Sequence, residues 1–464
     1  MKRGFRSEKD YLGFKKIPSN AYYGIQTQRA FDNFKVSGLH LQKSLIYSLA
    51  IIKRAAAISN MRERRLNRKI GNAIVKACDE ILKGKLDTEF HVDVFQAGAG
   101  TSENMNLNEV ISNRALEFLG KKKGSYHIIN PNDHVNMSQS TNDVFHTAIH
   151  LAAYLEIRNR LIPKLENLFR ELDSKSKKFK NVLKSGRTHL MDAVPITLGQ
   201  EFSGYAMAVK KDIGHIEEAS KSLLEINLGG TAIGTGLNAT GNYQRNAIKE
   251  INKITKVKFK PSKNLFEATQ NLDAIAYTSA ALKVLAINLI KIANDIRLLG
   301  SGPSTGFDEI KLPAVQPGSS IMPGKVNPSI AEMLDMVGFQ VIGNDATITF
   351  CCQAGQLELN VMMPLSAYSL LNSIEILSNG VEIFTEKCLS GIKANEKKCM
   401  EYLEKNPIIV TALTPYIGYS KAAEIAKKAY KEGKTVKQII LKEKLMDIKL
   451  LEKLFDTRKL VKKS

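Results

Sequence analysis

The chain has 464 residues with 44% hydrophobic content, 13 Pro and 31 Gly, which is typical of a globular protein and excludes disordered, collagen-like and low-complexity chains. Its 67 Lys and Arg residues exceed its 46 Asp and Glu residues, which leaves a formal net charge of +21. These basic residues are scattered and lack interleaved aromatic residues, which argues against a nucleic-acid partner and favours a solvated basic surface.

The N-terminal segment, residues 1–16, is charged and lacks an apolar stretch of signal-peptide length. Nowhere do 18 uncharged apolar residues follow one another, so the sequence predicts no membrane-spanning segment. The five cysteines are odd in number and lack metal-finger spacing, which indicates reduced thiols rather than a disulfide framework or a zinc ribbon. We therefore expect a cytoplasmic protein without a membrane partner.

Long stretches with apolar residues at three- and four-residue intervals predict a mainly α protein. One such stripe runs from Leu151 to Leu172, where Pro163 should start or kink a helix. Further long helices are predicted at about 265–299, 329–349 and 365–388. Because the mean helix has only about 11 to 12 residues, we expect a long-helix bundle in the core.

The two ends of the chain contain shorter helical patterns and more turn residues than its middle. After Gly391 the chain is rich in Lys and is broken at Pro407 and Pro415. We expect three domains: an N-terminal domain (1–139), a central helical bundle domain (140–390) and a small C-terminal domain (391–464).

Four separated stretches combine glycine with small polar residues beside predicted helix starts, namely residues 98–104, 139–143, 186–189 and 318–328. Hydroxyls and amides at a helix N-terminus usually cap the helix. The unpaired backbone N–H groups and the positive dipole end there also bind carboxylates or phosphates. Four such stretches in a basic chain favour one carboxylate-binding pocket over four separate caps.

Two other patterns superficially suggest a cofactor. Residues 234–239 fit the G-x-G-x-x-A dinucleotide pattern, but no alternating strands and helices surround them, so we expect a turn between core helices. His146 and His150 lie four residues apart on one helix face, but no third ligand follows, so we expect ordinary histidines. The sequence predicts no metal site and no required cofactor.

The last polar stretch, residues 318–328, reads Gly-Ser-Ser-Ile-Met-Pro-Gly-Lys-Val-Asn-Pro. Its two glycines, paired serines and lysine describe a mobile loop that brings a hydroxyl and a cation to one substrate. The string resembles the signature of the aspartase/fumarase superfamily. The resemblance extends over nearly the whole chain and includes residues 21–27, 104–106, 186–189 and 417–419.

Within this superfamily the chain looks most like aspartate ammonia-lyases, and class II fumarases come next. The aspartase-like stretches are residues 98–102, 121–130, 132–136, 140–143 and 354–360. Three residues depart from the pattern. Ser304 stands where many aspartases have Arg, Met363 where they typically have Glu, and His146 where both branches usually have Pro. The resemblance therefore implies reversible elimination of ammonia from L-aspartate, with hydration of fumarate to malate as the alternative.

Either reaction removes a proton from a carbon beside a carboxylate, so the enzyme must stabilise a dianionic enediolate. Lys325 and Asn327, with help from Thr141, are suited to hold that carboxylate. The resemblance implies that Ser319 is the base. A serine hydroxyl is a very weak acid, so its oxyanion would need support from backbone N–H groups and Lys325.

The resemblance also assigns the remaining site residues. His189 is the second catalytic residue and pairs with Glu332, and Arg187 either binds a carboxylate or forms a structural ion pair between helices. The substrate ligands that it implies are Thr101, Ser140, Thr141, Asn142, Thr188, Ser320, Lys325 and Asn327.

The resemblance further implies a homotetramer whose active sites combine residues from three subunits and take a small dicarboxylate. Activation by a divalent metal, as in some aspartases, stays open. A remote alternative is a non-catalytic basic binding protein on the same fold. The intact Ser319, Lys325, Asn327 and His189 argue against it, because binding alone would not require them.

Overall fold

The computed structural model describes residues 4–455 and 461. The chain divides into two compact units, each built from three separate segments. Unit 1 contains Met1–Pro163, Gly214–Val284 and Phe339–Ser378, and unit 2 contains Lys164–Ile213, Leu285–Gly338 and Asn379–Ser464. The division into three consecutive domains stays a prediction.

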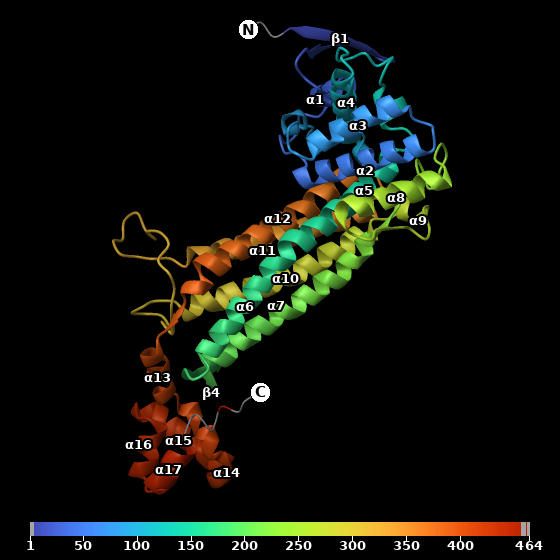
Figure 1. Ribbon diagram of the computed structural model, residues 1–464. Coiled ribbons are helices and arrows are strands. Elements are labelled where there is room, and N and C mark those ends of the chain that lie inside the picture. The colour runs from blue at the N-terminus through green and yellow to red at the C-terminus, as the bar shows by residue number, and fades with distance from the viewer. Residues whose placement is uncertain (1–3, 456–460, 462–464) are drawn as a thin grey trace. The chain divides into compact units, whose positions relative to one another are not determined.

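Unit 1 is mainly helical and begins with a two-stranded antiparallel sheet (Figure 1). Its helix α2 places Leu45, Leu49, Ile52 and Ala56 on one fully buried face, at the three- and four-residue spacing of an amphipathic helix. This helix packs against α3, α5 and α8. The strands and helices of unit 1 are β1 (Phe5–Asp10), β2 (Gly13–Pro18), α1 (Ile25–Asn33), α2 (Lys43–Arg62), α3 (Arg68–Ile81), α4 (Thr101–Phe118), α5 (Thr141–Glu156), β5 (Glu225–Ile226), α8 (Gly241–Thr255), β6 (Lys260–Pro261) and α9 (Glu267–Gln270).

Five helices contribute residues to both units, and the three longest of them have 25 to 27 residues. These three are α10 (Asp273–Leu299), α11 (Ser329–Gln353) and α12 (Met363–Lys387), and their positions confirm the long helices predicted from the sequence. The helix predicted at about 265–299 is shorter than expected, because α9 ends at Gln270 and α10 begins only at Asp273.

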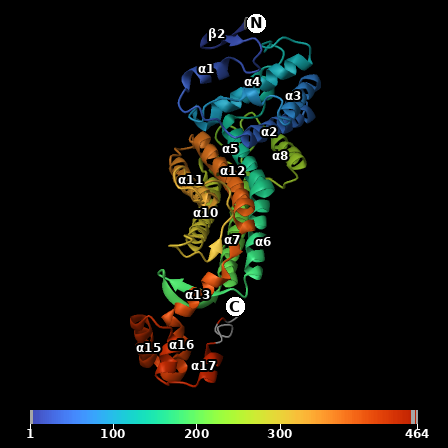
Figure 2. The same ribbon diagram turned by 90° about the vertical axis from the view of Figure 1, so that its left-hand side faces the viewer.

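In unit 2, segments of five helices lie side by side as a bundle (Figures 1 and 2). Lys164 of α6 (Ile162–Lys178) forms an ion pair with Glu382 of α12 at 2.7 Å. Asn288 of α10 donates to Asp212 of α7 (Leu198–Ser220) at 2.9 Å. A Cβ atom on Gly338 of α11 would lie 2.6 Å from Ile290, so α10 and α11 pack very closely there. The mainly helical, bundle-forming fold is therefore confirmed.

Pro163 begins a helix, as predicted. A π-helical turn, Ile157–Leu161, separates α5 from α6, and Pro163 is the second residue of α6. Proline has no N–H group, and the first turn of a helix does not need one.

The remaining elements of unit 2 are short. β3 (Leu183–Thr188) and β4 (Met191–Thr197) form an antiparallel hairpin, and β7 (Ile310–Lys311) pairs with β8 (Lys393–Ala394). A separate apolar cluster, which includes Leu413, Ile425 and Ile439, holds the C-terminal helices together. These helices are α14 (Thr414–Ile417), α15 (Tyr419–Glu432), α16 (Val436–Lys442) and α17 (Ile448–Leu454). The preceding helix, α13 (Glu396–Lys405), packs against β3.

By length and composition, α10 could cross a membrane, and it is the one such helix in the described part of the chain. Half of its apolar window is buried among other residues, as in the core helix of a soluble protein, so this is weak evidence for a membrane span. All five cysteines are free thiols, which agrees with their predicted reduced state.

Candidate active site

The first predicted stretch positions Thr101 as the first residue of α4. A short 3-10 turn, Gly98–Gly100, precedes the helix, and Thr101 is exposed there. Gly100 has φ of +83°, and a Cβ atom on it would lie 2.4 Å from the ring of Phe145 in α5. Only glycine lets the starts of α4 and α5 approach this closely.

The second stretch, residues 139–143, contains three candidate ligands at positions 140–142, which are called the substrate turn below. The Ser140 hydroxyl caps α5, and Ser140 and Asp143 together form a capping box. Thr141 is the first residue of α5, and its Oγ1 accepts a hydrogen bond from Asn104 of α4 at 3.0 Å. The structure thus brings the candidate ligands of the first two stretches to adjoining helix starts. Ser140 therefore caps α5, which is the ordinary role of a hydroxyl at a helix start, and this role does not depend on substrate binding.

A buried lysine lies behind the substrate turn. Lys53 of α2 is fully buried and donates to Asn136 Oδ1 at 2.8 Å. Asn136 Oδ1 also accepts from Asn104 at 3.3 Å, which links Lys53 to Thr141 through two amides. Burial lowers the pKa of Lys53 to about 7. Sequence reasoning did not single out this lysine, because only the fold shows that it is inside.

A buried carboxylate holds the other side of the substrate turn. Asp143 accepts from the backbone N–H of Ser140 at 2.9 Å and from that of Gly229 at 2.8 Å. Burial raises the pKa of Asp143 to about 6, and the backbone hydrogen bonds and the charge of Lys53 partly oppose that rise. In addition, Asn142 Nδ2 donates to the carbonyl of Ala232 at 2.7 Å.

The third predicted stretch, residues 186–189, does not precede a helix, which corrects the prediction. Arg187 and Thr188 belong to strand β3, and His189 and Leu190 form the hairpin tip with φ of +57° and +59°. Two successive residues with positive φ are typical of a tight hairpin turn whose twist matches the strands. Thr188 and His189 are exposed at this tip.

Arg187 forms a structural ion pair. Its Nη1 lies 2.9 Å from Oε1 of the fully buried Glu309, and its guanidinium stacks over the Phe307 ring at 4.2 Å. Lys184 contacts the same carboxylate at 2.8 Å. The structural alternative for Arg187 is therefore present, but the pair joins a strand to a loop and does not join two helices as predicted. Ser304 lines an open pocket of about 530 Å³ beside Arg187.

The fourth stretch is a loop, residues 318–328, called the signature loop below. Two hydrogen bonds join the beginning of this loop to its end. Gly318 N donates to Lys325 O at 2.8 Å, and Asn327 Nδ2 donates to Gly318 O at 2.7 Å. One N–H of the Asn327 amide therefore serves the loop itself. α11 begins at Ser329, directly after the loop.

The signature loop supports Ser319 with its own backbone. Ser319 Oγ accepts from the N–H of Met322 at 2.9 Å and from that of Ile321 at 3.2 Å. Two N–H groups aimed at one oxygen would stabilise negative charge on it. Ser320 and Lys325 are exposed. Both donors to Ser319 lie two and three residues further along the loop, as they do for an ordinary turn hydroxyl, so the role of Ser319 as the base stays a prediction.

Glu332 lies in the first turn of α11, and its carboxylate is 4.0 Å from Nη2 of Arg297. In the described part of a single chain, no hydrogen bond or ion pair joins Glu332 to His189, so that pairing stays a prediction.

The two patterns that superficially suggest a cofactor lie elsewhere. The G-x-G-x-x-A pattern at residues 234–239 lies in a loop between β5 and α8, without a dinucleotide fold around it. His146 and His150 are both buried in the core, as expected.

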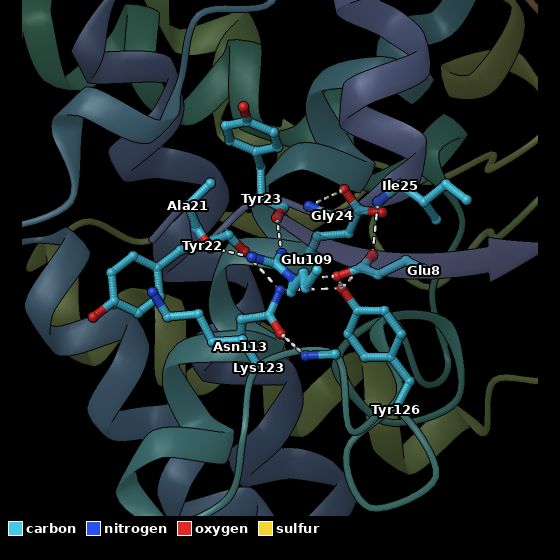
Figure 3. A network of polar contacts seen from close by, with 12 residues as sticks. Glu8, Ala21, Tyr22, Tyr23, Gly24, Ile25, Glu109, Asn113, Lys123 and Tyr126 are labelled. Atoms are coloured by element: carbon cyan, nitrogen blue, oxygen red, sulfur yellow. Dashed lines mark hydrogen bonds and ion pairs between the residues drawn. The ribbon is translucent and has the colours of Figure 1, made fainter. Parts of the chain in front are cut away.

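The motif at residues 21–27 is fixed by carboxylates that sequence reasoning missed. Glu109 is buried and accepts a hydrogen bond from the N–H of Gly24 at 2.9 Å (Figure 3). It also accepts one from Thr27 Oγ1 at 2.6 Å. Glu8 accepts from the N–H of Ile25 at 2.9 Å and from Tyr126 (Figure 3). The sequence around Glu8 and Glu109 contains no motif that marks them, because their partners are mainly backbone N–H groups far away in sequence.

The described residues contain no group of three or more His, Cys, Asp or Glu that could hold a metal ion. The four polar stretches offer hydroxyls, amides, backbone N–H groups and Lys325. These groups suit a small carboxylate substrate.

Comparison with known proteins identifies the family. Residues 13–343 match the family model described as Lyase, and residues 409–462 match that described as Fumarase C C-terminus. The chain is 51% identical to an aspartate ammonia-lyase of Bacillus subtilis over 442 residues, which are 95% of this chain and 93% of that protein. It is 48% identical to a class II fumarate hydratase of Helicobacter pylori over 447 residues, which are 96% of each chain.

A solved structure agrees with these relatives. A Brucella melitensis protein, described as a fumarate lyase:delta crystallin bound to cobalt, superposes with a TM-score of 0.96 at 47% identity and covers 99% of this chain and 100% of that one. The match therefore extends to the whole fold and to both ends of the sequence. The chain belongs to the aspartase/fumarase superfamily and is a lyase.

Proposed function

We propose that the protein is an aspartate ammonia-lyase that converts L-aspartate reversibly to fumarate and ammonia. In this reaction a proton leaves the β-carbon, a carbon–carbon double bond forms, and the bond between the α-carbon and nitrogen breaks. Ser319 takes the proton as the base, and Lys325 with Asn327 and Thr141 holds the carboxylate on which charge builds. His189 handles the departing ammonia. Thr101, Ser140, Thr188 and Ser320 complete the substrate contacts.

The observation that carries the ammonia-lyase proposal is the orientation of the Asn142 amide. Its Nδ2 donates one of its two N–H groups to the Ala232 carbonyl, which can only accept, so the carboxamide oxygen stays available, as does the second N–H. An available acceptor suits the ammonium group of aspartate, which carries three charged N–H donors. The hydroxyl of malate is a neutral single donor and gains less from the same oxygen.

A class II fumarate hydratase is the second candidate, because relatives with that name are nearly as similar as the aspartate ammonia-lyases. Ser304 and Met363 also depart from the aspartase pattern.

A direct assay separates the two functions. The purified protein is incubated with L-aspartate and, separately, with L-malate, and the appearance of fumarate is followed by absorbance. We expect turnover of L-aspartate. Turnover of malate alone would assign the protein to the hydratases, and turnover of neither would contradict both proposals. Titration with divalent ions and EDTA in the same assay shows whether a metal activates the enzyme.

We also propose a homotetramer in the cytoplasm with active sites shared between subunits. The exposed apolar side chains of α10 and α11 support an assembly, because Ile287, Met336, Phe339 and Phe350 are each more than half exposed in the single chain. Sharing would also let the exposed Thr188 and His189 of one chain meet candidate residues of another. Sedimentation analysis gives the oligomeric state, and a stable monomer with full activity would contradict the shared site.

A further inference from the structure

The glycine-rich segment, residues 227–239, contacts the substrate turn directly, and its Ala232 carbonyl is the partner of the Asn142 amide. It joins β5 to α8. The N–H groups of Gly229 and Thr231 donate to Asp143 Oδ2 at 2.8 and 3.2 Å. The carbonyl of Ala232 in the same segment accepts from Asn142 Nδ2 at 2.7 Å. The segment therefore binds two consecutive residues at the start of α5.

Asp143 is the residue that joins the two regions. Its side chain is fully buried, and its other oxygen, Oδ1, accepts from the N–H of Ser140 at 2.9 Å. One carboxylate thus binds the substrate turn with one oxygen and the glycine-rich segment with the other. Hydrogen bonds to a charged acceptor are stronger than neutral ones, so Asp143 holds the glycine-rich segment strongly against the substrate turn.

The backbone of the glycine-rich segment has little freedom to rearrange. Gly234 has φ of +98°, and a Cβ atom on it would lie 2.8 Å from the backbone nitrogen of Phe266. Thr231 has φ of +54°, which is uncommon for a β-branched residue, and its N–H is one of those bound by Asp143. Such strain persists only where surrounding contacts enforce it, and it concentrates at functional sites.

We propose that Asp143 is a positioning residue that clamps the glycine-rich segment to the substrate turn and thereby fixes the direction of the Asn142 carboxamide. The Ala232 carbonyl holds the amide nitrogen, which leaves the amide oxygen directed at the substrate's amino group. This inference rests on the proposed role of Asn142 in the ammonia-lyase reaction. Loss of the clamp frees Ala232, and the Asn142 amide can then rotate.

The test compares Asp143→Asn with Asp93→Asn. Asp93 is a matched control, because it is a buried carboxylate of unit 1 that also accepts backbone N–H groups, here from Ser37 and Gly38. For each folded variant, KM is measured for L-aspartate and, in the reverse direction, for fumarate with saturating ammonia. Fumarate carries no amino group, so its KM reports general damage to the site.

For Asp143→Asn we expect KM for L-aspartate to rise about tenfold while KM for fumarate changes less than about twofold. Asp93→Asn should lower the melting temperature and leave both KM values near wild type. Equal changes in the two KM values, or none, would show that Asp143 has only a structural role and would overturn the inference.

A second variant disturbs the segment without touching Asp143. Gly236 has φ of +71°, and a Cβ atom on it would lie 3.2 Å from the carbonyl oxygen of Gly229. We expect Gly236→Ala to raise KM for L-aspartate in the same selective way, by a smaller factor. Failure of both this variant and Asp143→Asn to fold would also overturn the inference. Absence of wild-type turnover of L-aspartate would instead contradict the proposed function on which the inference rests.

Discussion

The signature loop and the substrate turn carry candidate residues of the same reaction, but they are held in opposite ways. The signature loop is closed by its own backbone, and Ser320 and Lys325 are exposed on it. The substrate turn is held from behind by Lys53 and Asp143, both fully buried. In the single chain, the support of the signature loop is therefore local, whereas the support of the substrate turn comes from buried side chains. Substitutions in the loop should therefore affect turnover, and substitutions in the anchors should affect stability or substrate discrimination.

The largest effect is expected at Ser319 in the signature loop. Ser319→Ala removes the proposed base, so kcat for L-aspartate should fall about 100-fold or more, while the melting temperature stays unchanged. Ser203→Ala is the control, because Ser203 is an exposed residue of α7 that bonds only a carbonyl on its own helix. Steady-state kinetics and a thermal melt measure both quantities. Retained turnover would exclude Ser319 as the sole base, and a large loss of stability would show that Ser319 supports the fold.

A buried carboxylate that supports the motif at residues 21–27 should show the opposite result. Glu109→Gln replaces one carboxylate oxygen by an NH₂ group that faces N–H donors, so the free energy of unfolding should fall by about 2 kcal/mol. Urea unfolding measures the change. Glu89→Gln is the matched control, because Glu89 is less buried and accepts from Tyr22 and Tyr23 on the same segment. A larger loss of stability for the Glu89 variant would contradict the proposed importance of burial.

A more moderate effect is expected for the cation of the signature loop. Lys325→Met keeps the length of the side chain but removes its charge, so KM for L-aspartate should rise about tenfold. Lys263→Met, at an exposed lysine in a loop of unit 1, should leave KM unchanged. If Lys325→Met raises KM no more than Lys263→Met does, then Lys325 does not bind the substrate. Kinetics at two salt concentrations distinguish a direct contact from a general loss of positive charge.

The smallest effect concerns pH. Burial lowers the pKa of His150 to about 4, below its ordinary value, so the folded protein keeps this imidazole neutral. The unfolded chain takes up the proton as the pH falls below about 6.5, so stability is lost on acidification. We expect this one group to lower the free energy of unfolding by about 1 kcal/mol between pH 6 and pH 5. In His150→Gln the stability should depend less on pH over that interval, as measured by urea unfolding at each pH. An unchanged pH dependence would show that His150 is not the group responsible.

Much of the fold follows from patterns that can be read along the chain. The three-and-four spacing of apolar residues predicts α10, α11 and α12, because the burial of a helix face demands that spacing. Except for the start of α10, each predicted end lies within a few residues of the observed end. Pro163 was correctly expected at the start of a helix. The pattern failed at residues 186–189, where small polar residues beside glycine were taken for a helix start. Such residues suit hairpin turns and helix caps equally well, so composition could not distinguish them.

The candidate site was predictable where its residues lie in one continuous string. The signature loop and the capping box at Ser140 and Asp143 are local in sequence, and resemblance to the superfamily supplied their roles. The supports of the site were not predictable in the same way. Lys53, Glu109 and the glycine-rich segment contact residues that are 80 or more positions away.

By itself the sequence determined a mainly helical lyase of the aspartase/fumarase superfamily, along with the groups available for carboxylate chemistry. Only the tertiary structure decided which charges are buried and which polar groups satisfy them. It assigned Arg187 to Glu309, placed Lys53 beside Asn136, and turned the Asn142 amide toward Ala232. The physical reason is that helix propensity and turn chemistry act over a few residues, whereas the cost of burying a polar group depends on partners that only the folded chain brings together.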